Sequence, residues 1–96
     1  MAAAEDHQID LHDATLESIE VDWGRATVVV RLAALGGPIV LTATGLRSIV
    51  VPRYEPWGPS SSVNKAGTRT HVGELTLELQ MQSGDEIVIR AASLTV

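Results

Sequence analysis

The densest group of side chains able to hold a metal ion or move a proton lies near the start of the sequence. Asp10, His12 and Asp13 supply two carboxylates and an imidazole within four residues, and His71 is a further potential ligand. These groups bind divalent metals, so together they would suit a metal-dependent hydrolase. They match no spaced motif such as HExxH, however, and Asp10 and Asp13 equally fit a turn whose side chains cap backbone groups. We favour capping, and assign no catalytic residue, metal site or cofactor.

The run Ser60, Ser61 and Ser62 is the second candidate for chemistry. A serine becomes a nucleophile only when a base is held against its hydroxyl. The sequence contains neither GxSxG nor SxxK, the short patterns that mark such serines. We therefore interpret the run as a turn and expect a protein that is not an enzyme.

Two of the three aromatic residues lie in one proline-flanked segment, where Tyr54 and Trp57 follow Arg53 and precede Asn64 and Lys65. Prolines restrict the unfolded chain and so lower the entropy lost when a loop becomes ordered. We take these five residues as the candidate binding group. Trp57 either covers one end of the core or faces outward as an anchor for another molecule.

Alternation of apolar and polar residues predicts strands throughout the sequence and no long helix. The expected strands cover residues 15–22, 26–33, 39–44, 46–51, 74–82 and 86–94. The clearest is 74–82, in which Leu75, Leu77, Leu79 and Met81 face inward. In the first, Ile19, Val21 and Trp23 should face the core. The second, rich in valine, should be covered on both faces, after a turn in which Gly24 takes a positive φ.

Two segments lack this periodicity. Residues 1–10 are expected to be a frayed end, and residues 52–73 a long loop rich in proline and serine. A structureless loop of that length is uncommon, so residues 61–65 and 68–72 are candidates for added pairing. The whole, residues 1–96, should be a single all-β domain of six to seven short antiparallel strands, forming a sandwich or a partly open barrel.

Composition and charge limit the kinds of partner and the cellular location that can be expected for the protein. The formal charge is −5, and seven acidic residues precede Arg25 without a single lysine or arginine. Phosphate contacts need a dominant basic surface, so nucleic acid is not expected as a partner. There is no apolar stretch of the ~18 residues that a membrane helix needs, and residues 1–6 do not resemble a signal peptide. Cysteine is absent. We expect a cytoplasmic protein that does not bind membranes.

Three short stretches carry a resemblance to known proteins: Leu11-His12-Asp13-Ala14, the segment from Glu55 to Ser60 (EPWGPS), and the segment from Met81 to Asp85 (MQSGD). In these the chain resembles small bacterial proteins of unassigned function, some of them similar to immunity proteins that neutralise polymorphic toxins. The resemblance implies a β-rich bacterial protein that binds another protein, and it assigns no role to any residue.

Three functions remain open from the sequence. The first is a non-enzymatic interaction module, pairing with a second copy or with a partner protein through the segment 53–65 and the sheet edges. The second is a binder of a sugar or another small polar ligand, stacked on Tyr54 and Trp57 with Arg53 and Asn64 as polar partners. The third is the metal-dependent hydrolase. The absence of a catalytic motif favours the first.

Overall fold

The chain folds into strands without a helix over the part that the computed structural model describes, residues 5–54 and 61–96. The strands are β1 (Glu5–Ile9), β2 (Thr15–Asp22), β3 (Thr27–Ala34), β4 (Gly37–Thr44), β5 (Ser48–Val50), β6 (Val63–His71), β7 (Glu74–Met81), β8 (Glu86–Ala91) and β9 (Ser93–Thr95). Accordingly, these ranges include no helix of the length and apolarity that crossing a membrane requires.

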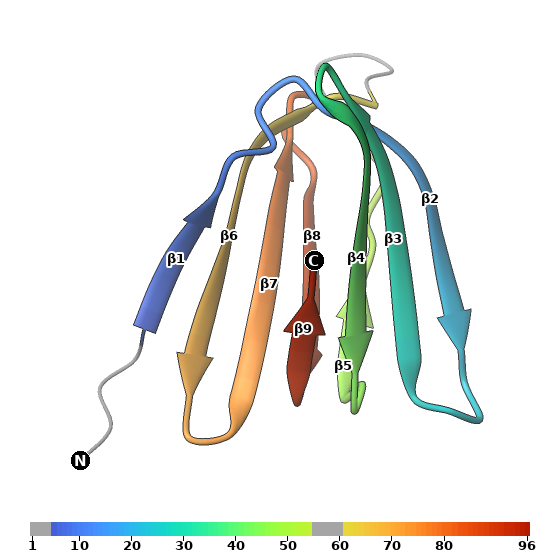
Figure 1. Ribbon diagram of the computed structural model, residues 1–96, viewed down its shortest axis with the longest axis vertical. Coiled ribbons are helices and arrows are strands. Elements are labelled where there is room, and N and C mark those ends of the chain that lie inside the picture. Colours follow the sequence, from blue (N-terminus) through green and yellow to red (C-terminus); the bar gives the residue numbers. More distant parts are fainter. Residues whose placement is uncertain (1–4, 55–60) are drawn as a thin grey trace.

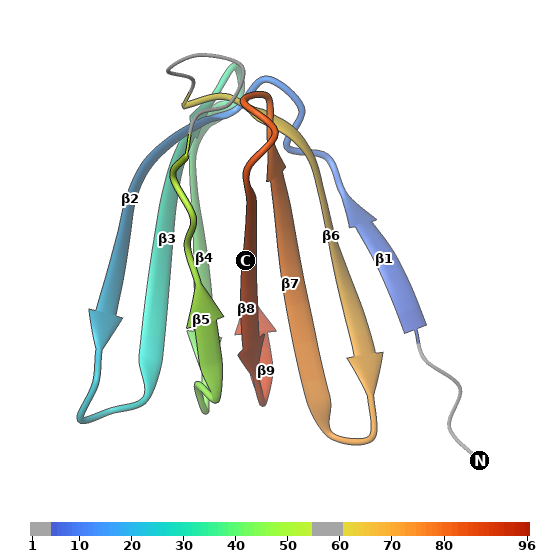
Figure 2. The ribbon, with the colours of Figure 1, turned by 180° about the vertical axis from the view of Figure 1, so that it is seen from behind.

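Two antiparallel sheets form a sandwich, which decides between the two architectures that the sequence allows. One sheet has the order β1-β6-β7-β8-β5 and the other β2-β3-β4-β9 (Figures 1 and 2). Their inner faces supply a core of branched aliphatic side chains. Its largest fully buried members are Leu11, Leu32, Leu41, Leu77, Leu79, Ile89, Val28, Val30 and Val63.

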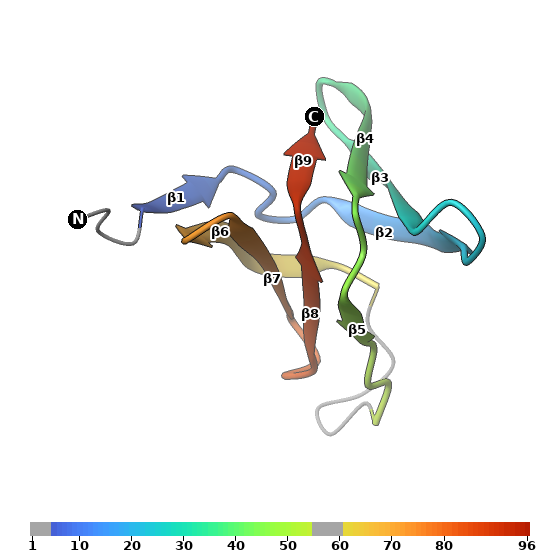
Figure 3. The same ribbon diagram turned by 90° about the horizontal axis from the view of Figure 1, so that it is seen from below.

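A folded-over pair of strands joins the two sheets at the lower end of Figure 1. β4 pairs with β9 in one sheet, and the continuations of both strands, β5 and β8, pair in the other. The backbone bonds follow the bend: the Ala92 N–H donates to the Thr44 carbonyl at 3.0 Å, and the Arg47 N–H to the Arg90 carbonyl at 2.8 Å. Viewed from below, β8 and β9 lie in line, beside β5 and β4 (Figure 3). Strands that switch sheets in this way close a corner of the sandwich.

A second corner closes at the upper end, where the connection between β1 and β2 meets the start of β6. The Asp13 N–H donates to the Val63 carbonyl at 2.9 Å, and the Val63 N–H to the Ala14 carbonyl at 2.8 Å. Leu11 is buried beneath this corner. Ser61 and Ser62 belong to it through their backbones, since the Ser61 carbonyl accepts from Leu16 and Ser62 bridges Thr15. These two residues are therefore paired with β2 and do not form the turn that the sequence suggested; Ser60 lies outside the described residues.

Below this corner β1 and β2 diverge (Figures 1 and 2), so the lower half of β2 has no opposing layer. The expectation that Ile19, Val21 and Trp23 are all core residues is therefore wrong. Ile19 is half-buried, Val21 is 45% exposed and Trp23 is 84% exposed. The side chains alternate as the sequence indicates, but alternation does not tell whether a second sheet covers the inner face.

The described strands number nine rather than six or seven, for three reasons. The expected frayed end contains β1, a mostly polar edge strand that pairs with β6 and packs Ile9 against the core. The expected loop 52–73 contains β6, which joins both candidate pairing segments into one strand. The expected last strand bends at Ala92 into β8 and β9.

Two smaller expectations about β3 and its turn are also wrong. β3 is central in its sheet, but Arg31 and Ala33 are exposed on its outer face, so only the inner face is covered. In the turn before it Ala26, not Gly24, has the positive φ, of 52°. The structure gives no reason why an alanine occupies this position.

Gly45 should be the least replaceable glycine of the lower corner. Its φ is +68°, and a Cβ added there would lie 2.7 Å from the Ala92 Cβ. We expect Gly45→Ala to lower the free energy of unfolding by roughly 1–3 kcal/mol, because the backbone strain and the clash add. Gly36→Ala is the control, since an added Cβ there meets nothing within 4 Å. Chemical denaturation of both variants checks this, and equal midpoints would contradict it.

The two faces of β7 should differ in their tolerance of alanine. Leu77 is fully buried, whereas Glu78 faces outward and is half-buried. Truncating a buried leucine costs about 2–5 kcal/mol, so Leu77→Ala should destabilise the domain strongly and Glu78→Ala only slightly. Thermal unfolding followed by circular dichroism compares them. Similar losses would mean that the faces of β7 are assigned wrongly.

Candidate functional site

Of the residues considered for metal binding, His12 and Asp13 lie close together, but His71 is remote from them. His12 lies in the upper corner, where its Nδ1 is 2.7 Å from the Asn64 carbonyl oxygen and its Nε2 is 3.6 Å from Asp13 Oδ2. His71 ends β6, and the strand between Asn64 and His71 is roughly 23 Å long at about 3.3 Å per residue. In residues 5–54 and 61–96 no three histidine or acidic side chains are grouped so that they could hold a metal ion.

Asp13 has the hydrogen-bonding role that the turn interpretation predicts. Its backbone has a φ of 67°, a conformation that aspartate tolerates better than most residues. Its Oδ1 accepts a hydrogen bond of 2.7 Å from Gln82 Nε2, and Gln82 also donates its backbone N–H to the Ser62 carbonyl. Asp13 thus ties the β1–β2 connection to the turn after β7.

The candidate binding residues divide into two groups. Asn64 and Lys65 are exposed at the start of β6, next to a bulge, and Asn64 Nδ2 donates to Gln80 Oε1 at 3.2 Å. Arg53 and Tyr54 follow β5, at the other side of the same sheet. The Tyr54 N–H bonds to Asp85 in the turn between β7 and β8, so β7 lies between Tyr54 and the residues at the start of β6. Trp57 lies outside the described residues.

Tyr54 is exposed but its backbone is fixed. Its side chain is 85% exposed, whereas its N–H donates to Asp85 Oδ1 at 3.1 Å. Asp85 is itself buried in the turn between β7 and β8, where its Oδ2 accepts from the Ser83 hydroxyl at 3.1 Å. A charged side chain is rarely buried without such partners. Asp85 therefore fixes the point at which the segment after β5 leaves the sheet.

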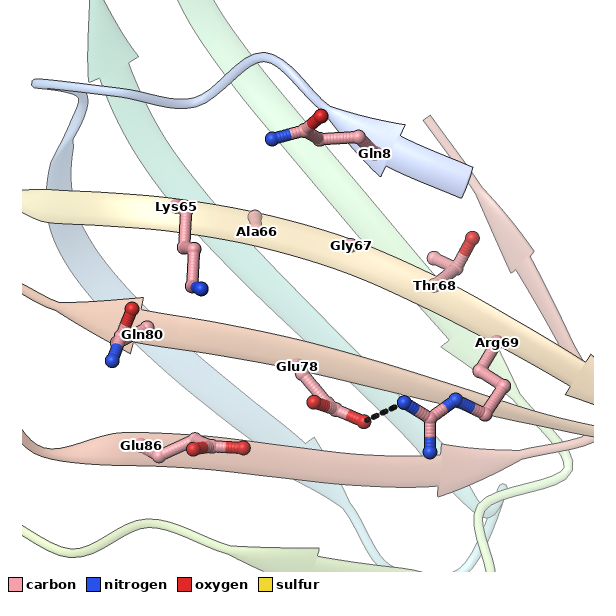
Figure 4. A pocket seen from close by; sticks show the side chains of 9 residues that line it. All are labelled: Gln8, Lys65, Ala66, Gly67, Thr68, Arg69, Glu78, Gln80 and Glu86. Carbon is pink, nitrogen blue, oxygen red and sulfur yellow. Dashed lines mark ion pairs between the residues drawn. The ribbon is translucent and has the colours of Figure 1, made fainter. Parts of the chain in front are cut away.

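A polar hollow of about 510 Å³ lies on the outer face of the five-stranded sheet, over β1, β6, β7 and β8. Figure 4 shows its lining: Gln8, Lys65, Ala66, Gly67, Thr68, Arg69, Glu78, Gln80 and Glu86. Gly67 pairs with Gln8 on one side and with Glu78 on the other. Because glycine has no side chain, the backbone at this position forms the floor of the hollow. A second hollow, of about 360 Å³, shares Gln8 and Lys65 and extends to His12 in the upper corner.

Charges of both signs surround this hollow. Lys65, Gln80 and Glu86 are aligned across β6, β7 and β8, so an ammonium and a carboxylate flank an amide. One row lower, Arg69 Nη2 lies 3.9 Å from Glu78 Oε1. Neither Lys65 nor Glu86 makes an ion pair with another described residue. Both charges are therefore available to a bound molecule.

An apolar margin borders the same face at β5. Val50 is 56% exposed and pairs with Val88, which also faces outward. Val51 is 47% exposed, and exposed Tyr54 follows three residues later. Single exposed apolar residues are normal, but consecutive ones at the edge of a sheet are typical of contact surfaces. We call the hollow and this margin together the outer face.

Sequence reasoning missed most of the hollow. The outward alternation of Glu78, Gln80 and Glu86 was readable in the sequence, and Lys65 was selected. What could not be read was that residues 63–71 form a strand beside β7, and that Gln8 belongs to a strand at all. Only those pairings bring Gln8, Arg69 and Glu78 together.

Comparison with known proteins identifies the fold alone. No family model and no curated protein matches this chain. A crystal structure of an uncharacterized protein from Neisseria gonorrhoeae is similar with a TM-score of 0.70, covering 98% of this chain and 96% of that one, at 11% sequence identity. The similarity supports the antiparallel sandwich over almost the full length.

The link between Asp85 and Tyr54 can be tested directly. Asp85→Ala removes the acceptor of the Tyr54 N–H, so we expect about 1–3 kcal/mol less stability and faster hydrogen exchange at the Tyr54 amide. Glu86→Ala is the matched control, because Glu86 is adjacent but exposed. Exchange at Tyr54 that is unchanged in Asp85→Ala would show that the carboxylate does not hold this segment.

Proposed function

We propose that this domain is a non-enzymatic interaction module that binds a partner protein with the outer face of its five-stranded sheet. The observation that carries the proposal is the exposed apolar margin of Val50, Val51 and Tyr54 beside a hollow whose lining includes the charged groups of Lys65 and Glu86, neither of which forms an ion pair with another described residue. Protein interfaces combine a few apolar or aromatic anchors with polar groups that fix register. We further propose, from the sequence, that the protein is cytoplasmic.

Two features support a protein rather than a small molecule as the partner. The hollow has the volume of a ligand pocket, but it is open and its described lining contains no aromatic side chain on which a sugar ring would stack. The polar partners expected for Tyr54 are divided, because Asn64 lies at the start of β6 and bonds to Gln80, whereas the Tyr54 backbone is held at the turn between β7 and β8. An open surface that combines a polar hollow with an apolar margin is better matched by another folded surface.

The resemblance to immunity proteins suggests which partner to test first. Such proteins bind a toxin domain, and a basic toxin surface would be drawn to the acidic chain described here, with its formal charge of −5. A second copy of the chain is the other candidate occupant of the outer face, and the mass in solution distinguishes the two.

The test is affinity capture from the source cells, followed by calorimetry with the purified partner and defined variants. Val50→Asp and Tyr54→Ala should each weaken binding by about tenfold or more, since each removes an apolar anchor. Lys65→Glu should alter the salt dependence of binding. Thermal unfolding of each variant confirms that the fold is kept.

Val40→Asp is the matched control, because Val40 is 39% exposed on the outer side of β4, in the other sheet. It should bind as the unaltered chain does. If Val40→Asp weakens binding and the three outer-face variants do not, the proposed surface is wrong. Sedimentation velocity with the same variants shows whether a second copy occupies the face.

A further inference from the structure

The edge strand β2 presents an uncovered apolar row. Among the described strands, β3 is the one neighbour of β2 in its four-stranded sheet, and apart from the bridge between Thr15 and Ser62 no other described segment pairs with β2. Along its inner face exposure increases toward the lower end: Ile19 is half-buried, Val21 is 45% exposed and Trp23, just beyond the strand, is 84% exposed. Ile19 still packs against the core, whereas Val21 and Trp23 are largely exposed to solvent.

The cause is the divergence of the two sheets below the upper corner. β2 and β6 meet at Thr15 and Ser62 and then separate downward (Figure 1). At the lower end of the opposite sheet Val72 is also exposed, at 76%. An extra strand placed beside β2 would put its inner side chains into this opening and would extend the core between the sheets.

The outer side of β2 is acidic. Glu17, at the bulge, Glu20 and Asp22 are all exposed, and the strand contains no basic residue. Glu20 is 3.2 Å from Arg31 and Asp22 is 3.8 Å from Arg25, but both ion pairs are exposed to solvent and so are weak. Glu17 makes no ion pair with another described residue.

We propose that β2 receives an extended segment of another protein as a fifth strand of the four-stranded sheet. The segment that fits alternates apolar residues, which face Ile19 and Val21, with lysine or arginine residues, which face Glu20 and Asp22. The main-chain bonds supply affinity and the alternating side chains supply selection. This surface belongs to the other sheet and is independent of the outer face proposed above.

A second copy of the chain is a poor occupant of this edge. Antiparallel pairing of two β2 strands would set carboxylates against carboxylates, and like charges directly opposite each other are destabilising. Acidic side chains and the bulge between Leu16 and Ser18 are also devices that discourage unselective edge pairing. A partner of opposite charge overcomes the first of these, and pairing along Ser18 to Asp22 avoids the bulge.

The probe is an acetylated, amidated peptide of alternating valine and lysine, titrated into the labelled protein and followed by amide NMR. We expect shifts concentrated at Ser18 to Asp22. The same peptide with glutamate in place of lysine should not bind. Val21→Lys puts a charge on the inner row and Glu20→Lys reverses a charge on the outer side, so each should weaken binding by about tenfold or more.

Val40→Lys is the matched control, because Val40 is exposed to a similar degree on a strand that has neighbours on both sides. Full binding by Val40→Lys together with loss in Val21→Lys supports the proposal. It is overturned if the lysine peptide leaves the β2 amides unshifted, if both peptides bind equally, or if the protein is a dimer that Val21→Lys dissociates. Circular dichroism of each variant establishes that it is folded.

Discussion

The bend at Gly45 and Ala92 is the constraint on which the rest of the structure depends. A sheet built from these strands has one apolar face, and the chain has no helix in its described part to cover it. The solution is to fold one ladder over, so that β4 and β9 continue as β5 and β8 in the opposite layer. Because the backbone bonds persist around the bend, the two layers share one ladder and their inner faces are brought together.

The second corner, at Asp13 and Val63, lies at the opposite end of the sandwich, and this diagonal placement explains both surfaces discussed above. Strands joined at the top diverge at the bottom, which leaves the inner row of β2 open. At the other side of the sandwich β5 is only three residues long, and the apolar side chains of Val50, Val51 and Tyr54 at and after its end are exposed. The exposed apolar groups therefore follow from where the corners are.

The sequence predicts side-chain direction well and pairing poorly. The inward positions of Leu77, Leu79 and Met81 follow from period-two alternation alone, and the all-β class follows with them. The strand β6 has a bulge and few apolar residues, so the sequence indicates two short candidate segments there but neither the continuous strand nor its partners. The residues that lie beside β6 come from distant parts of the sequence; Gly67, for example, pairs with Gln8 on one side and Glu78 on the other. Most of the polar hollow therefore could not be predicted from the sequence. The same holds for Val21, whose exposure depends on where the other sheet ends.

The topology also governs how the chain reaches its folded state. The hairpins β2-β3-β4 and β6-β7-β8 connect neighbours in sequence, but both corners join residues about fifty apart, as in Thr44 with Ser93 and Thr15 with Ser62. Such distant pairings close slowly, because the entropy of the intervening loop is lost before the contacts form. While β8 and β9 are still inside the ribosome, a nascent chain can form neither of the two pairings of the lower corner, β4 with β9 and β5 with β8. Until then the sheet of β2, β3 and β4 leaves the side chains of Val28, Val30 and Leu41 exposed to solvent. Exposed apolar side chains of this kind are what chaperones bind.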